Sequence, residues 1–171
     1  MLTSADSWVS KARAAAPGRP PNDLCRVAAY SPDGSGDDVN EEFRAAVIAR
    51  LCADVGAEDR NIALFLLHDE ARAHESSDGY SDELGKCAYM LFLIGNVEDS
   101  LAIWRAKQTN FDTSCGVHVQ LLVGAGLEST LTFLRASSEE DAQNAAAYIE
   151  ECRAAGEFDD DYHAMLATHY A

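Results

Sequence analysis

The sequence predicts an all-α protein of about seven helices that stack as hairpins. Three observations support this class. From Asn40 onward, apolar residues recur every three or four positions, which is the period of an α-helix. Gly residues end these stretches and acidic residues follow them, as is common at helix ends. A short frame of a Gly, a small or polar residue and a bulky apolar residue also occurs four times: Gly56–Asn61–Phe65, Gly95–Ser100–Trp104, Gly124–Ser129–Phe133 and Gly156–Asp161–Met165.

The first forty residues differ in composition from the rest, so we divide the chain into an N-terminal segment, 1–38, and a helical domain, 39–171. The N-terminal segment is expected to be partly irregular. Within it, Ser4 to Ala16 is expected to form a short Ala-rich helix anchored by Trp8. The Pro-rich run from Pro17 to Pro21 ends that helix, because Pro removes a backbone donor and clashes with the preceding turn.

Two short segments connect this run to the helical domain. Leu24 to Tyr30 is apolar and is either a strand or a segment that docks on the core. Residues 31–38 have the Ser, Pro, Asp and Gly composition of a turn, and we expect them to be mobile.

Local sequence signals predict the helices of the main domain. Asn40 can cap the first helix. Residues 82–94 are apolar on nearly every side, which predicts a central, buried helix, and Gly95 can end it as a C-terminal cap. A capping box at 137–140 opens a later helix, and 117–123 is assigned as helix from its context although its alternation also fits a strand. The expected helices are 40–55, about 58–76, 82–94, 97–108, 117–123, 126–136, 137–155 and about 159–170, with a loop at 110–116.

The frame resembles the tetratricopeptide repeat, a helical hairpin with a period near 34 residues. The Gly residues of the frame lie 39, 29 and 32 positions apart. Two units depart from the family, with Asn61 and Asp161 in place of a small residue, and the Pro that usually ends a repeat is absent. The resemblance covers about residues 41–170 and implies a superhelix used as a binding scaffold, with an irregular helical bundle as the alternative. The unit that matches best carries Leu84, Ala88, Leu91, Gly95, Val97, Ser100 and Trp104.

The frame also makes a packing prediction. The pairing of a tight turn with a bulky residue in the following helix predicts that this residue is buried between the hairpins of a helical stack. The residues expected to be buried in this way are Phe65, Trp104, Phe133 and Met165.

The charge balance is strongly acidic. The 171 residues include 13 Lys and Arg against 29 Asp and Glu, which gives a formal net charge of −16. Such a surface repels nucleic acid phosphates and anionic membranes, so we expect neither as a partner. It attracts basic proteins instead, and a basic protein partner is therefore expected.

The cysteines indicate a reduced, cytoplasmic protein. The chain has five Cys, an odd number, and none forms a C-x-x-C pair, which argues against both a disulfide framework and a zinc knuckle. No signal peptide is apparent at the N-terminus and no apolar stretch is long enough to cross a bilayer. No P-loop or dinucleotide-binding Gly pattern occurs, and no cofactor is expected.

Two groups of side chains are candidates for protein binding. The first combines aromatic and acidic residues at the end of the most repeat-like unit, since aromatic side chains often anchor interfaces: Trp104, Phe111 and Asp112. The second is the sharpest acidic run, which can receive Arg or Lys side chains from a partner: Glu157, Asp159 and Asp160. Each group also has a structural reading, as packing between helices or as favourable charge at a helix N-terminus.

These observations favour a non-enzymatic protein–protein interaction module. Small acidic helical proteins of this kind look like bacterial immunity proteins, which occlude a basic toxin such as a nuclease. An Ala-rich composition with Arg far above Lys fits a bacterial source with GC-rich DNA. The immunity role is one specific version of the interaction hypothesis, and it rests on size and charge.

The alternative function is a helical metal-binding protein or metal-dependent enzyme. Glu70 and His74 lie one helical turn apart and can share a metal ion. The doublet His68-Asp69 resembles that of the His-Asp metal phosphohydrolases, but no His precedes His68, so one ligand of that family is missing. Cys115, three residues before His118, is the candidate for a nucleophile, and its ordinary reading is an inert loop thiol.

Overall fold

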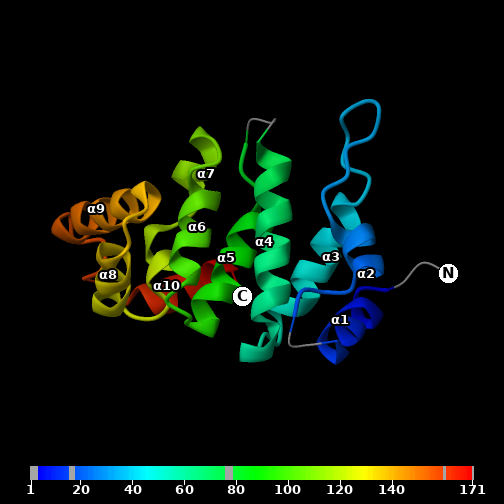
Figure 1. Ribbon diagram of the computed structural model, residues 1–171, viewed down its shortest axis with the longest axis horizontal. Coiled ribbons are helices and arrows are strands. Elements are labelled where there is room, and N and C mark those ends of the chain that lie inside the picture. The colour runs from blue at the N-terminus through cyan, green and yellow to red at the C-terminus, as the bar shows by residue number, and fades with distance from the viewer. Residues whose placement is uncertain (1–3, 16–17, 76–78, 160, 171) are drawn as a thin grey trace.

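The computed structural model describes residues 4–15, 18–75, 79–159 and 161–170 (Figure 1). Over these residues the chain forms ten α-helices, two short 3-10 helices and no β-strand, which confirms the all-α class and shows that about seven helices was too few. The α-helices are α1 (Ala5–Ala14), α2 (Asn22–Ala28), α3 (Glu41–Cys52), α4 (Arg60–His74), α5 (Asp82–Ile94), α6 (Asp99–Lys107), α7 (Phe111–Gly116), α8 (Leu127–Ala136), α9 (Glu140–Ala154) and α10 (Tyr162–Tyr170). The 3-10 helices are η1 (Ala57–Asp59) and η2 (Val119–Val123).

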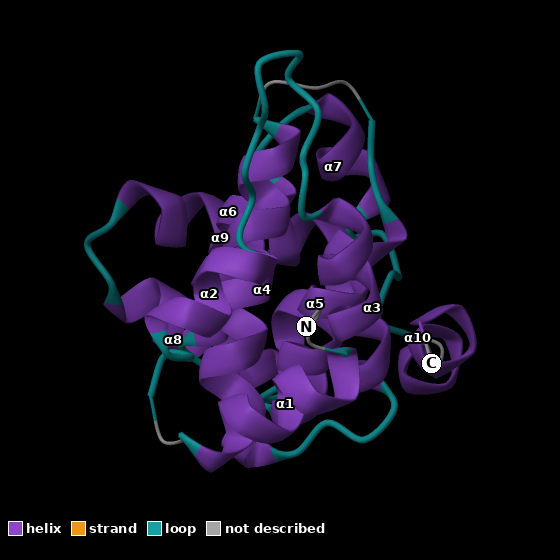
Figure 2. Ribbon diagram, turned by 90° about the vertical axis from the view of Figure 1, so that its right-hand side faces the viewer, coloured by secondary structure: helices purple, strands orange, loops and turns teal. Residues whose placement is uncertain are grey.

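Helices follow one another along the long axis of the molecule. In Figure 1 the chain runs from α1 and α2 at one end to α8 and α9 at the other. α10 then returns toward the middle and packs against α5. The second view looks along this long axis, with loops at the top of the molecule (Figure 2). No helix of the described residues is both long enough and apolar enough to cross a membrane.

α5 is the central helix, as its composition predicts. It packs against α3, α4, α6, η2 and α10, so nearly every side of it is covered. Its first turn is capped by Ser81, whose hydroxyl accepts the backbone N–H of Leu84 at 3.3 Å. Gly95 ends it in the left-handed conformation, with φ of 71°, which a residue with a side chain rarely adopts.

The N-terminal helices share the same core. The predicted helix over residues 4–16 is confirmed as α1, with Ser4 as its N-cap. Trp8 is fully buried, stacks on Phe65 of α4 and donates its indole N–H to the carbonyl oxygen of Leu24 at 2.9 Å. The division of the chain at residue 38 stays a prediction, and the packing of α1 and α2 on α3 joins both sides of it.

Three assignments of secondary structure differ from the prediction or resolve it. The strand alternative for Leu24 to Tyr30 is wrong, because most of this segment belongs to α2. The loop expected at 110–116 is instead α7. Residues 117–123 contain η2, so the helical assignment holds and the strand reading is wrong.

Two predicted caps are also absent. The Asn40 side chain makes no cap and donates to the carbonyl oxygens of Arg26 and Ala29 at 3.2 and 2.8 Å, which ties α3 to α2. Ser137 accepts the N–H of Glu139, which is itself the N-cap residue of α9 and makes no side-chain cap.

The turn at residues 31–38 is held by one carboxylate. Asp33 accepts the backbone N–H groups of Ser35, Gly36 and Asp37 at 2.7 to 3.2 Å, as short Asp turns do. These bonds account for the turn predicted from composition. The mobility expected of this segment stays a prediction.

The packing prediction for the repeated frame holds for two of its four residues. Phe65 and Trp104 are buried. Phe133 is only partly buried, because α8 lies at the end of the molecule. Met165 is 38% exposed, because α10 turns Leu166 and Tyr170 toward the core and leaves Met165 outside.

Candidate functional site

A buried ion pair joins α3 to α4. Arg44 is 1% exposed, and its Nε donates to Glu70 Oε1 at 2.5 Å while its Nη1 lies 2.7 Å from Asp38 Oδ2. Burial lowers the pKa of Arg44, but attraction to Glu70 and Asp38 outweighs it and leaves the pKa raised. Ser81 donates to the other oxygen of Glu70 at 3.1 Å. Sequence reasoning missed this cluster, because its members lie 6 to 37 positions away from Arg44 along the chain.

Two adjoining hollows lie over this ion pair and share Glu41, Glu70 and Ser81. Their volumes are about 290 and 390 Å³. The first turns of α3 and α5 meet there, and acidic side chains in first turns are favoured by the helix dipole. These first turns supply three of the carboxylates that line the hollows, Glu41, Glu42 and Glu83. The turn before α3 and the helix α4 supply the others: Asp37, Asp38 and Glu70. We call this region the acidic hollow.

The contacts of Glu70 and His74 do not favour the metal hypothesis. The Glu70 carboxylate is bound by Arg44 and Ser81, and His74 Nδ1 lies 2.8 Å from the Glu70 backbone oxygen. Within the described ranges, no group of three His, Cys, Asp or Glu side chains is arranged to hold a metal ion. His68 and Asp69 point apart, since His68 is exposed and Asp69 is buried with its carboxylate on the N–H of Tyr30.

α7 places one aromatic side chain in solvent beside the acidic hollow. Phe111, its first residue, is 81% exposed. The N-cap residue Asn110 donates to the carbonyl oxygens of His74 at 3.1 Å and Gly79 at 3.3 Å, and Asp112 accepts the N–H of Gly79 at 2.7 Å. These bonds fix α7 to the end of α4. In both views α7 and the turn at 31–38 project at the same edge of the molecule (Figure 2).

The structure thus separates the first predicted group. Trp104 is buried, with its ring 5.5 Å from that of Tyr148 of α9, and so it packs between helices. Asp112 is half-buried and supports the loop before α5. Phe111 alone of the three is free to contact another molecule.

The second predicted group lies near the C-terminus of the chain. Glu157 and Asp159 are exposed, and Asp160 lies outside the described residues. Gln120 donates to the backbone oxygen of Glu157 at 2.6 Å, which holds the turn after α9 on η2. Asp161 accepts the N–H of Ala164 and so supports the first turn of α10.

Most Arg side chains of the described residues are committed to carboxylates within the molecule. Eight of them form ion pairs: Arg13, Arg44, Arg50, Arg60, Arg72, Arg105, Arg135 and Arg153. Because the acids outnumber the bases, the charge left after this pairing is overwhelmingly negative. The acidic hollow and the turn at 31–38 contribute to that surplus at the edge that carries Phe111.

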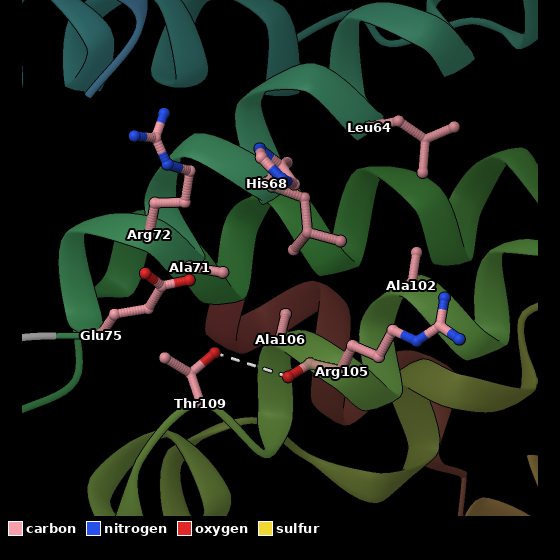
Figure 3. Close-up of a pocket in the computed structure, with 10 residues that line it drawn as sticks. Leu64, His68, Ala71, Arg72, Glu75, Ala102, Arg105, Ala106 and Thr109 are labelled. Carbon is pink, nitrogen blue, oxygen red and sulfur yellow. Dashed lines mark hydrogen bonds between the residues drawn. The ribbon is translucent and has the colours of Figure 1, made fainter. Parts of the chain in front are cut away.

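A second concave feature lies between α4 and α6 (Figure 3). It is a groove of about 290 Å³ whose walls combine apolar side chains with polar ones at the rim. Its lining residues are Leu64, Leu67, His68, Ala71, Arg72, Glu75, Ala102, Arg105, Ala106 and Thr109. The sequence did not indicate this groove, which depends on how α4 and α6 pack.

His118 has a hydrogen-bond partner on α10. Its Nδ1 lies 2.7 Å from the hydroxyl of Tyr170, which in turn lies 3.3 Å from the hydroxyl of Tyr80. Burial lowers the pKa of His118, with His169 and Lys107 adding to the effect, and burial also raises the pKa of Tyr170 well above its ordinary value. This arrangement anchors α10 to the start of η2 and to the residue before the cap of α5.

Comparison with known proteins finds no relative. No protein-family model, no curated protein and no solved structure matches the chain. Its function therefore has to be inferred from its own residues.

Proposed function

We propose that this protein is a non-enzymatic protein–protein interaction module of the cytoplasm whose acidic edge binds a basic partner. The observation that carries the proposal is Phe111, which is 81% exposed on a helix that is fixed in place beside the acidic hollow. An aromatic side chain held in solvent offers contact area without the entropy loss of ordering a flexible loop.

The surroundings of Phe111 support a basic partner. The acidic hollow includes His74 and Ser81, and α7 is bonded to the backbone of His74 and Gly79 through Asn110 and Asp112. A partner that covers Phe111 and extends over the end of α4 would reach the carboxylates of the hollow, Glu41 and Asp37 among them. Arg and Lys side chains at those positions would steer the encounter and fix its orientation.

The succession of helices supports a stacked-hairpin scaffold for this role. α4 packs beside α6, and α6 beside α9, while α3 packs beside α5, as the two rows of a tetratricopeptide-like stack would. In this proposal the tips of the helices carry the binding edge. A bacterial immunity protein that occludes a basic toxin is the specific version that the charge and size favour.

The test compares two variants as bait in co-purification from the native host. Phe111→Ala should lose the bound partner at least about tenfold. Leu93→Ala, which truncates a side chain that is 50% exposed on α5, is the matched control and should retain the partner. Quantitative mass spectrometry measures recovery of each protein, and circular dichroism checks that both variants fold.

A charge variant distinguishes electrostatic steering of the partner from its direct contact with Phe111. Glu41→Lys in the acidic hollow should slow association and flatten its dependence on salt, because electrostatic steering weakens as salt screens the charges. Equal recovery of the partner by wild type and Phe111→Ala would contradict the proposal. So would a partner without basic character whose affinity is the same at low and high salt.

A further inference from the structure

The helix α10 is held in place by few side chains. It stands at the side of the molecule in Figure 2 and packs chiefly against α5. Of its nine residues, only Leu166 and Tyr170 are buried, and Tyr162 is half-buried against Phe92 of α5. A helix of this length is not stable alone in water, so α10 depends on these contacts. Its local opening therefore costs less free energy than unfolding of the whole chain.

Tyr170 fills a slot that exists because two residues beside it lack side chains. A Cβ added to Gly85 of α5 would lie 2.4 Å from Cε1 of Tyr170 and 2.2 Å from the hydroxyl of Tyr80. A Cβ added to Gly116, the last residue of α7, would lie 2.5 Å from the ring of Tyr80. The Tyr170 ring also stacks on that of Tyr89, at 5.6 Å between centroids. A Gly within a helix weakens that helix, so α5 gives up some of its own stability to admit Tyr170.

His118 forms another wall of this slot. It is half-buried, and its Nδ1 lies 2.7 Å from the hydroxyl of Tyr170. Its ring lies 5.6 Å from the ring of Tyr170 and 5.0 Å from that of His169, measured between centroids. One imidazole thus contacts two successive residues of α10, and a change in its charge acts directly on the seat of that helix.

The surroundings of His118 disfavour a positive charge while α10 is docked. Burial is the main cause that lowers the pKa of His118, and His169 of α10 and Lys107 of α6 add to it, whereas Glu157 after α9 opposes them. The remaining titratable groups at the slot are hydroxyls whose pKa burial raises, so they stay neutral: Tyr80, Tyr89 and Tyr170. The nearest carboxylates of α5 act on these hydroxyls and not on the imidazole: Asp82 and Glu83.

We propose that α10 is a pH-sensitive latch: protonation of His118 in mildly acidic solution releases Tyr170 from its slot and undocks α10 while the rest of the fold stays intact. The released helix uncovers the aromatic face of α5, with Tyr89 and Phe92. A His whose pKa is lower in the docked form binds its proton more tightly in the open form. Docking is therefore strongest above the ordinary value of 6.5 and weakens as pH falls toward the docked value. The latch requires no partner and so stands apart from the function proposed above.

The test measures backbone amide hydrogen exchange of the full chain by mass spectrometry at about pH 7.5 and about pH 5.5, corrected for the intrinsic dependence of exchange on pH. The protection factor of α10 should fall about three- to tenfold at the lower pH. Tenfold is about the most that one His with an ordinary pKa of 6.5 can supply one pH unit below that value. The protection of α4 and of α5 should change much less.

His118→Asn keeps a polar side chain that does not titrate, and it should abolish the pH response of α10. His68→Asn is the matched control, because His68 is an exposed His of α4, and it should respond as wild type does. His169→Asn removes an exposed residue and one of the opposing charges, so it should reduce the response, and it keeps the test decisive if His118→Asn cannot dock α10 at all. Three outcomes would overturn the proposal: protection of α10 that ignores pH, equal responses in wild type and both variants of the slot, or protection lost from α4, α5 and α10 together.

Discussion

Arg44 shows how much a single buried side chain can connect. It holds Glu70 of α4 and Asp38 of the turn before α3, with hydrogen-bonding distances to both. A buried ion pair is not in itself a large gain in stability, because both charges lose their water. Removing one partner is costly, however, because the other charge then stays buried and uncompensated.

Arg44→Met should therefore lower the free energy of unfolding by about 3–5 kcal/mol, because Glu70 and Asp38 lose their cation. The matched control is Arg135→Met, which breaks an exposed pair with Glu150 and should cost about 0–1 kcal/mol. Urea unfolding followed by circular dichroism measures both. Equal losses for the two variants would show that Arg44 is not the centre of a buried cluster.

Single residues also explain why the candidate site was only partly predictable from the sequence. Trp104 and Phe111 are both aromatic and seven positions apart, yet one is buried and the other is 81% exposed. The difference arises at Asn110, whose cap starts a new helix in place of the expected loop. Arg44 and Glu70 were out of reach for another reason: only the packing of α3 and α4 on the shared helix α5 brings these residues together.

Among the elements, the end of η2 lies so close to the backbone of α5 that no side chain fits between them. A Cβ added to Gly124, which follows η2, would lie 2.5 Å from the carbonyl oxygen of Phe92 on α5. Gly124 has an ordinary φ of −56°, so it is the space and not the backbone conformation that requires Gly. The close packing of this turn on α5 thus explains why the third copy of the repeated frame has a Gly at position 124.

Gly124→Ala should destabilise the fold by about 1–3 kcal/mol, because the backbone of α5 must shift to make room. Gly34→Ala is the control, since a Cβ there meets nothing within 4 Å and its φ is not positive. Thermal unfolding of the two variants measures the difference. If Gly124→Ala unfolds at the temperature of Gly34→Ala, the close contact does not exist in solution.

The elements that could be predicted are those with a strong local signal. α5 was placed at its observed bounds because its apolar run lies between Ser81 and Gly95. α2 and α7 are seven and six residues long, too short for a periodic pattern to show. The capping pair Asn110 and Thr113 was the available signal for α7, and it is visible in the sequence.

At the scale of the whole molecule, carboxylates with bonded partners make stability depend on pH. Hydrogen bonds from Arg50 and Arg13 lower the pKa of Asp54 from 3.8 to about 2. Bonds from Ser35 lower the pKa of Asp33. Burial raises the pKa of Asp38, but bonds from Ser31 and Arg44 outweigh it and leave that pKa lowered too. A lowered carboxyl pKa stabilises the fold above the unfolded value and loses this effect as pH falls through the folded value.

Asp54→Asn isolates one of these contributions. The variant should be less stable than wild type by a constant amount above pH 3.8, and the gap should shrink as pH falls toward about 2. Comparing urea midpoints of both proteins over this pH range cancels the changes that they share. A gap that stays constant down to the lowest pH would show that the ion pairs of Asp54 are absent in solution.

α7 also gives the molecule a natural place for a reporter. Cys115 is exposed and lies one helical turn from Phe111, whereas the other four thiols are buried or half-buried: Cys25, Cys52, Cys87 and Cys152. A thiol-reactive fluorophore would therefore attach at the acidic edge without any engineered cysteine. Its emission would change as a partner covers Phe111, so that docking could be followed in real time on the unmodified sequence.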